Sequence, residues 1–232
     1  MSKGMQRSYV NAGGLFFISE YVSPAFEDDT LAGHLAFQLA ASSRHNKFDD
    51  TVRWRQAYMK AMTTFGSITL RRDEQSICVA EQLSVWDLVK ESLNGRVSPA
   101  LINRAQETLI HLQTGDADGF EFFRERTTQS LAVDQSDLPV DEVTSAIALQ
   151  LAFIDSEPLM TQVFISFKTT SQITGMPFAQ LMEQGYIVGN LEMTLVVTEL
   201  DDHHYARSRS GLLKKLGNLR QQLIFKMNEG EP

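Results

Sequence analysis

Alternation of apolar with polar or small side chains over residues 144–168 is the feature that most constrains how this chain folds. Apolar residues fill every second position from Ile147 to Phe153 and again from Val163 to Phe167, on either side of the turn-forming segment 155–158. Successive side chains of a strand point to opposite faces, so the pattern predicts a β-hairpin with one buried face. The odd-numbered apolar side chains are predicted to be the buried ones.

Two later segments repeat the same period of two. Leu191 to Val197 predicts a third strand, and Leu223 to Met227 predicts a fourth. Between them, leucines at positions 212, 213, 216 and 219 have helical spacing, which predicts a helix over residues 206–220. A short helix is predicted before the third strand, at residues 178–184.

The first half of the chain is predicted to be mainly helical, because its apolar residues recur every three or four positions. Helices are expected at residues 29–44, 50–65, 84–94 and 98–114, several of them after a capping serine or aspartate. Residues 67–70 and 76–80 favour strands on either side of a polar segment, which predicts a second hairpin. Residues 15–18 are interpreted either as a first strand or as an apolar anchor on the core.

Together these elements predict an α+β fold, with helices packed on one face of a mainly antiparallel sheet built largely from residues 144–227. One domain over residues 1–232 is expected. The alternative is an α-rich part, residues 1–135, followed by a β-rich part, residues 143–232. A length of 232 residues and a hydrophobic content of 43% are sufficient for a substantial core.

Charge and cysteine content restrict the function classes. A net charge of −8 argues against general nucleic-acid binding, because phosphate binding requires a positive surface. Cys78 is the single cysteine, so no intramolecular disulfide can form, and its apolar neighbours predict a buried, unreactive thiol. The sequence shows no secretory signal and no membrane-spanning stretch, so a cytoplasmic protein is expected.

The most unusual local feature is a basic segment, residues 203–227, which contains six lysines and arginines and no acidic residue. Such a segment fits a phosphate, a phosphorylated partner or an acidic surface on a second copy of the chain. A solvated helix face is the alternative interpretation. The candidate residues for binding an anion or a partner are Arg207, Arg209, Lys214, Lys215 and Arg220.

Asp202, His203 and His204 directly follow the third predicted strand. A strand followed by Asp-His-His resembles the DHH phosphoesterases, whose aspartates and histidines hold divalent metals, and this resemblance implies a metal-dependent hydrolase. It covers three residues, and the aspartate-rich N-terminal motif of those enzymes is absent here. A polar loop at a strand end is the competing interpretation, so no metal site and no cofactor are assigned.

No nucleophile elbow and no glycine-rich phosphate loop is present, and His34 is interpreted as a core histidine on a helix. The leading hypothesis is therefore a non-catalytic binding or assembly role, in which a sheet surface or the basic helix meets a protein partner or a second copy. A hydrolase with its site at Asp202, His203 and His204 is the alternative. A membrane-active protein that inserts its β-hairpin into a bilayer is the second alternative.

Overall fold

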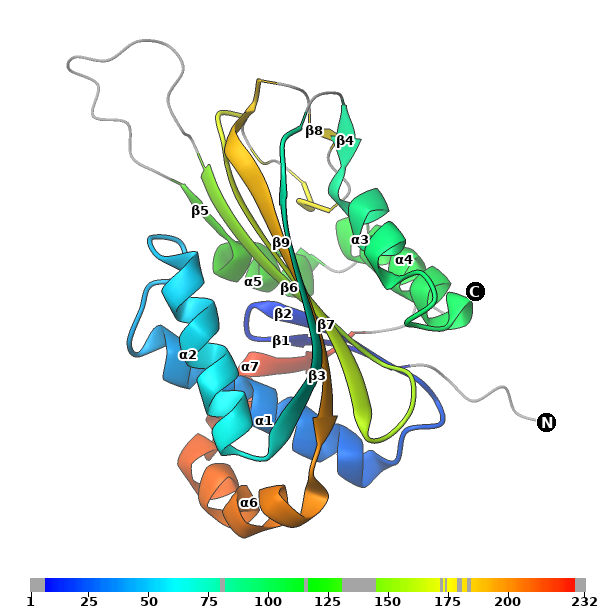
Figure 1. Cartoon of the computed structure of the whole chain (residues 1–232), viewed down its shortest axis with the longest axis vertical. Helices are drawn as coiled ribbons and strands as arrows, with labels where there is room; N and C mark the ends of the chain where they lie inside the picture. The colour runs from blue at the N-terminus through cyan, green and yellow to red at the C-terminus, as the bar shows by residue number, and fades with distance from the viewer. Residues whose placement is uncertain are drawn as a thin grey trace.

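The computed structural model describes residues 7–79, 82–114, 117–130, 145–171, 173, 175–178, 181–182 and 185–227. Its centre is a sheet of long strands between two layers of helices (Figure 1). The helices are α1 (Pro24–Ser42), α2 (Thr51–Thr64), α3 (Val85–Leu93), α4 (Pro99–Thr114), α5 (Ala117–Thr127), α6 (Asp202–Leu216) and α7 (Leu219–Leu223). The strands are β1 (Arg7–Asn11), β2 (Gly14–Ile18), β3 (Ser67–Ile77), β4 (Leu83–Ser84), β5 (Thr128–Ser130), β6 (Ser145–Ile154), β7 (Leu159–Thr169), β8 (Leu181–Met182), β9 (Ile187–Leu200) and β10 (Ile224–Lys226).

The main sheet has the strand order β10-β1-β2-β6-β7-β9-β3, and β5 also pairs with β6. The β2–β6 pair is parallel, and the other pairs of this sheet are antiparallel. Strands β4 and β8 form a separate short sheet. The predicted α+β class is confirmed, and the sheet combines strands from both halves of the chain.

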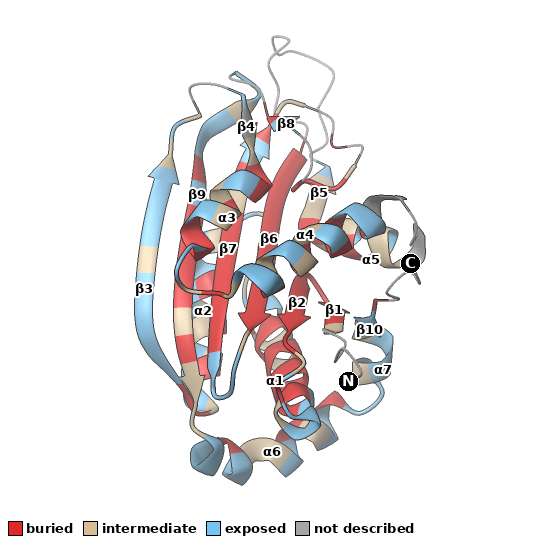
Figure 2. Cartoon of the chain, turned by 90° about the vertical axis from the view of Figure 1, so that its right-hand side faces the viewer, coloured by how far each residue is buried: buried red, intermediate tan, exposed pale blue. Residues whose placement is uncertain are grey.

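Helices cover both faces of the sheet, whereas the sequence indicated one covered face. The odd-numbered side chains of β6 and β7 lie under α3, α4 and α5, and the even-numbered side chains lie under α1, α2 and α6. Figure 2 shows β6 and β7 buried between these two layers and β3 exposed at the sheet edge. Gln162, which the predicted hairpin placed on an open face, is 0% exposed. The expectation that this face meets water is therefore wrong.

The helix starts follow from capping chemistry. The Ser23 hydroxyl accepts a hydrogen bond from the Phe26 amide at the start of α1, and Pro24 occupies the first turn, where its missing N–H costs nothing. Asp50 caps α2 and Ser84 caps α3 in the same way. The helices predicted at residues 29–44, 50–65, 84–94 and 98–114 are confirmed as α1 to α4, with α1 beginning five residues earlier. The predicted helix over residues 206–220 is α6 followed by α7.

Two short elements differ from the prediction. Residues 67–77 form one continuous strand, β3, that pairs along β9, so the predicted turn at residues 71–75 is wrong. The charged side chains of that segment are compatible with a strand because they lie at the exposed edge of the sheet. The predicted helix at residues 178–184 is also wrong where the structure describes it, because Leu181 and Met182 form β8.

Backbone contacts place α6 across one end of the sheet. The Asp201 amide donates to the Gly66 carbonyl at 2.9 Å, and the Leu200 amide donates to the Pro158 carbonyl at 3.1 Å. Gly66 has a φ of +100°, and a Cβ there would lie 3.1 Å from the Tyr205 nitrogen, so both conformation and space favour glycine. The end of β9, the β6–β7 turn and the start of α6 are therefore neighbours.

Within the described residues, none of the helices combines the length and the apolar composition that crossing a membrane requires.

We expect Gln162→Asp and Val163→Asp each to lower the free energy of unfolding by about 3 kcal/mol or more, because each buries an unpaired charge on one face of β7. Leu159→Asp is the control, because Leu159 lies in the same strand but is 40% exposed. Denaturant unfolding of the three variants measures the difference. A Gln162→Asp variant as stable as Leu159→Asp would contradict the burial of the second face.

Candidate functional site

The apolar face of β6, β7 and β9 is the largest continuous feature of the core. Cross-strand neighbours such as Leu151, Val163 and Leu195 form rows in which the residues are at most 4% exposed. The layer formed by α3, α4 and α5 covers these rows with apolar side chains. The rows consist of Ile147, Leu149, Leu151 and Phe153 on β6, Val163, Ile165 and Phe167 on β7, and Leu191, Met193 and Leu195 on β9.

The opposite face of the same strands contains a buried polar network. The Tyr58 hydroxyl on α2 donates to Gln162 Oε1 at 2.9 Å and accepts from Gln150 Nε2 at 2.7 Å. It also pairs with Nδ1 of His34 on α1. The four side chains are at most 3% exposed, and burial of such groups is tolerated only when they are hydrogen-bonded. The network therefore joins α1, α2 and both strands of the hairpin.

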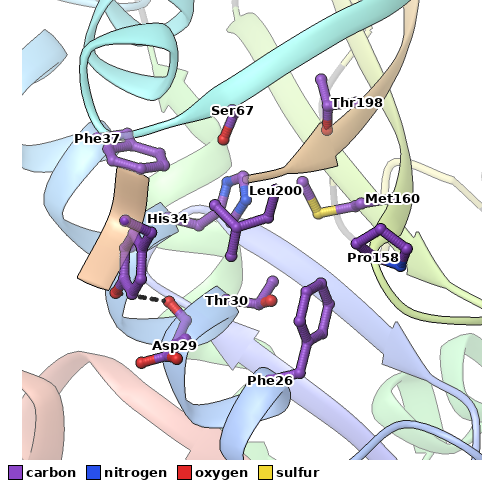
Figure 3. A pocket seen from close by; sticks show the side chains of 12 residues that line it. Phe26, Asp29, Thr30, His34, Phe37, Ser67, Pro158, Met160, Thr198 and Leu200 are labelled. Atoms are coloured by element: carbon purple, nitrogen blue, oxygen red, sulfur yellow. Dashed lines mark hydrogen bonds between the residues drawn. The ribbon is translucent and has the colours of Figure 1, made fainter. Parts of the chain in front are cut away.

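His34 also lines a small hollow of about 20 Å³ between α1, α6 and the ends of β7 and β9. Figure 3 shows the imidazole in this hollow with Met160 and Leu200 nearby. Burial without a nearby carboxylate lowers the pKa of His34 to about 3, because the charged form would lose its hydration. The histidine is therefore neutral at ordinary pH. The prediction of a core histidine is confirmed.

Asp29 lies at the rim of the same hollow. Burial raises its pKa, although an ion pair with Arg209 on α6 acts in the opposite direction. The Tyr205 hydroxyl donates to the Asp29 carbonyl at 3.1 Å, and Arg220 pairs with Asp28 one residue earlier. These contacts attach the C-terminal helices α6 and α7 to α1.

The layer of α3, α4 and α5 has polar contacts with the sheet near the β6–β7 turn. Asp155, directly after β6, accepts from the Ser98 amide and the Ser98 hydroxyl, both at 2.8 Å. Arg96 donates to Asp73 on β3 at 2.9 Å. Over the rows themselves the contact is apolar. Apart from a buried contact of 3.2 Å between the hydroxyls of Ser8 on β1 and Thr108 on α4, the rest of the layer is held mainly by the hydrophobic effect.

The five basic residues proposed from the sequence have two different surroundings. Arg209 pairs with Asp29 and Asp202, and Arg220 pairs with Asp28, so these two guanidiniums hold α6 and α7 in place. Arg207, Lys214 and Lys215 are exposed. The Arg207 guanidinium lies 3.1 Å from Nε2 of His203 one turn earlier.

Asp202, His203 and His204 form the first turn of α6, and Asp201 caps that helix through the His204 amide at 3.0 Å. Their side chains are exposed. In the part of the chain that the structure describes, no group of three His, Cys, Asp or Glu side chains is placed to hold a metal ion. The arrangement gives the hydrolase hypothesis no support.

Cys78 is exposed, just after β3, so the prediction of a buried thiol is wrong. Its neighbours Ile77 and Val79 contact the core on one side of the strand end and leave Cys78 on the other. Sequence reasoning also missed the Tyr58 network. Gln150 and Gln162 were a usable signal, because long amides inside hydrophobic strands require partners.

We expect acid to destabilise the fold through His34. Its pKa falls from 6.5 to about 3 on folding, so between those values the unfolded chain binds a proton that the folded chain does not. The free energy of unfolding should therefore fall as the pH falls from 6.5 to 3, by up to about 5 kcal/mol from this residue. Urea unfolding at several pH values measures the slope, which His34→Gln should reduce.

His111→Gln is the control, because His111 is an exposed histidine on α4. Asp29 acts in the opposite direction, since a raised carboxyl pKa favours the folded state as the pH falls, and it is unchanged in both variants. Lys47, whose pKa burial lowers to about 7, is already protonated over this range. An equal slope for wild type and His34→Gln would contradict the role of His34.

No protein-family model matches the sequence, and no curated protein matches it. Among solved structures, a delta-endotoxin is similar with 15% identity and a TM-score of 0.45, covering 82% of this chain and 81% of that chain. The activated Cyt2Ba monomer from Bacillus thuringiensis subsp. israelensis is similar with 14% identity and a TM-score of 0.47, covering 83% and 99%. The Evf virulence factor has 9% identity and a TM-score of 0.32, covering 96% and 85%. These likenesses do not assign the chain to a family.

Proposed function

We propose that this protein is membrane-active and acts by inserting strands β6, β7 and β9 into a lipid bilayer. The observation that supports this proposal is the continuous apolar face of three adjacent antiparallel strands. They contain 10, 11 and 14 residues, and a strand needs about 9–11 residues to cross the hydrocarbon core. Length and pattern therefore both fit insertion.

The two faces of these strands suit two different surroundings. A membrane-inserted strand requires apolar side chains on the lipid side and tolerates polar side chains on the other side. The rows from Ile147 to Leu195 would meet lipid. The other face is mixed: it contains the polar Gln150, Gln162, Thr194 and Thr198 beside apolar side chains such as Phe164 and Val196, and it would face water or another chain. In the folded protein the Tyr58 hydroxyl pairs with one atom of each glutamine, Gln150 Nε2 and Gln162 Oε1, and in the inserted state water replaces it.

Insertion requires the layer of α3, α4 and α5 to leave the apolar face. Because lipid tails are about as apolar as leucine side chains, exchanging this layer for lipid costs little hydrophobic energy. The polar contacts at Ser98 and Arg96 must break, at about 1 kcal/mol for a typical hydrogen bond and more where a charge is involved. The layer is therefore the part of the fold that a membrane can displace.

Insertion also leaves unpaired backbone groups, because β6 and β9 lose β2 and β3. Inside a bilayer each such N–H and C=O costs several kcal/mol, so copies of the chain must pair edge to edge. Membrane activity in this form requires self-association on the membrane. It therefore agrees with the assembly role considered from the sequence.

Binding of an acidic partner without insertion is a second proposal. It is favoured by Arg207, Lys214 and Lys215, which are exposed on α6 and pair with no carboxylate among the described residues. Only the first proposal requires the helical layer to separate from the sheet.

We expect a disulfide between the β6–β7 turn and α4 to block membrane activity. Ser98→Cys with Asp155→Cys, in a Cys78→Ser background, joins two side chains whose oxygens are 2.8 Å apart, so only a small adjustment closes the bond. Release of a trapped dye from vesicles should be at least tenfold slower for the oxidised variant, and a reducing agent should restore it. Ser98→Cys alone is the control, and oxidation should leave its activity unchanged.

Equal dye release before and after reduction would show that the layer stays in place during activity. If wild-type protein released no dye from vesicles of any composition, the proposed function would be wrong.

A further inference from the structure

Three basic side chains of α6 form a surface that the fold itself does not use. We call Arg207, Lys214 and Lys215 the cationic stripe. All three are exposed, and no carboxylate in the described part of the chain lies within ion-pair distance of them. Residues 207 and 214 are seven apart, so they lie on the same side of the helix two turns from each other, and Lys215 is adjacent.

Two other cations, Arg209 on α6 and Arg220 on α7, differ from the stripe because they have internal partners. Arg209 and Arg220 pair with Asp29 and Asp28 at the start of α1. Charge reversal there would release α6 and α7 from α1 and destabilise the fold. Reversal in the stripe breaks no ion pair of the described residues, so the stripe can be tested without disturbing the core.

The stripe lies at the end of the molecule where the inserting strands turn. Figure 1 shows α6 beginning just beyond the end of β9, at the same end of the molecule as the β6–β7 turn. The Leu200 amide donates to the Pro158 carbonyl of that turn, which makes the two segments neighbours. Two exposed apolar side chains lie near this turn. Leu159 is 40% exposed, and Tyr21 is 82% exposed close to Ser23, whose amide donates to Glu157 in the turn.

We infer that the cationic stripe binds the phosphate groups of anionic lipids and so determines which end of the molecule meets the bilayer first. A chain with a net charge of −8 is repelled by an anionic surface unless a local positive region faces it. The stripe supplies that region, and the apolar side chains beside it suit the lipid interface. The inferred lipid binding does not depend on insertion, whereas its role as the step before insertion rests on the proposed function.

Sedimentation of the full chain with vesicles tests this inference. The vesicles contain phosphatidylcholine alone or with about a third phosphatidylserine, and the salt concentration is varied. Wild-type protein should bind the anionic vesicles, and binding should weaken as salt rises. Arg207→Glu with Lys214→Glu and Lys215→Glu should reduce that binding by about a hundredfold, since each basic residue near such a surface contributes roughly fivefold.

The control is Arg44→Glu with Arg53→Glu and Lys60→Glu, which makes the same change in net charge at exposed cations on and before α2. It should keep most of the binding. An equal loss in both variants would show that net charge alone matters and would overturn the inference. Lys214→Gln with Lys215→Gln, a milder change, should show an intermediate loss, so the test does not depend on how well the reversed variant folds.

Two further measurements distinguish a lipid from a soluble anion as the ligand, and lipid binding from membrane insertion. Inorganic polyphosphate should have little effect on the thermal stability of the wild type, whereas anionic vesicles should lower the concentration of unbound protein. If polyphosphate binds and vesicles do not, the ligand is a soluble anion and the inference is wrong. Absence of binding to any vesicle also overturns it, and favours an acidic protein partner. Vesicle binding without dye release would overturn the proposed function and leave the lipid contact intact.

Discussion

The hydroxyl of Tyr58 makes it possible to bury the polar face of the central hairpin. Without it, Gln150 and Gln162 beneath α1 and α2 would keep only their mutual contact of 3.2 Å, and each buried polar group left without a partner costs about 1–3 kcal/mol. With it, α1 and α2 can close over β6 and β7, and His34 is held uncharged in the same network. The position of α6 follows in turn, because Arg209 and Tyr205 of α6 bind to residues of α1.

The two covers of the sheet therefore differ in how they are held. The cover formed by α1, α2 and α6 combines apolar packing with directional hydrogen bonds and ion pairs, which fix one arrangement. The cover formed by α3, α4 and α5 depends mainly on apolar contact, which is non-directional and which lipid can replace. This difference is what we expect of a protein that exchanges the contacts of α3, α4 and α5 for lipid and keeps the contacts of α1, α2 and α6. The asymmetry is the physical basis of the proposed function.

Much of the fold could be predicted from periodicity, because alternation in residues 145–168 and helical spacing in α1 to α4 reflect burial directly. The burial of the second face could not be predicted, because the pattern of alanines and glutamines at alternate positions of β6 is the same whether these side chains contact water or Tyr58. The continuous strand β3 was missed because Arg71 to Gln75 resembles a turn in composition, and only its place at the sheet edge explains the charges. The stripe on α6 was predictable as part of a basic segment. Sequence spacing could not distinguish Arg209 and Arg220 from the stripe, because their ion-pair partners lie 180 and 192 residues away.

The pairing of β1 with β10 has a consequence for how the chain is made. Residues 9–11 reach their partners at residues 224–226 only after about 215 further residues have been synthesised, which at 5–20 residues per second takes roughly 10–40 seconds. The parallel β2–β6 pair likewise joins positions about 136 residues apart. Contacts of such long sequence separation form late. The apolar rows of β6 and β7 are thus synthesised before the sheet that flanks them is complete, and a nascent chain exposes the same surface that the finished protein covers. Chaperones that hold apolar strands would determine how much of this protein reaches its folded state.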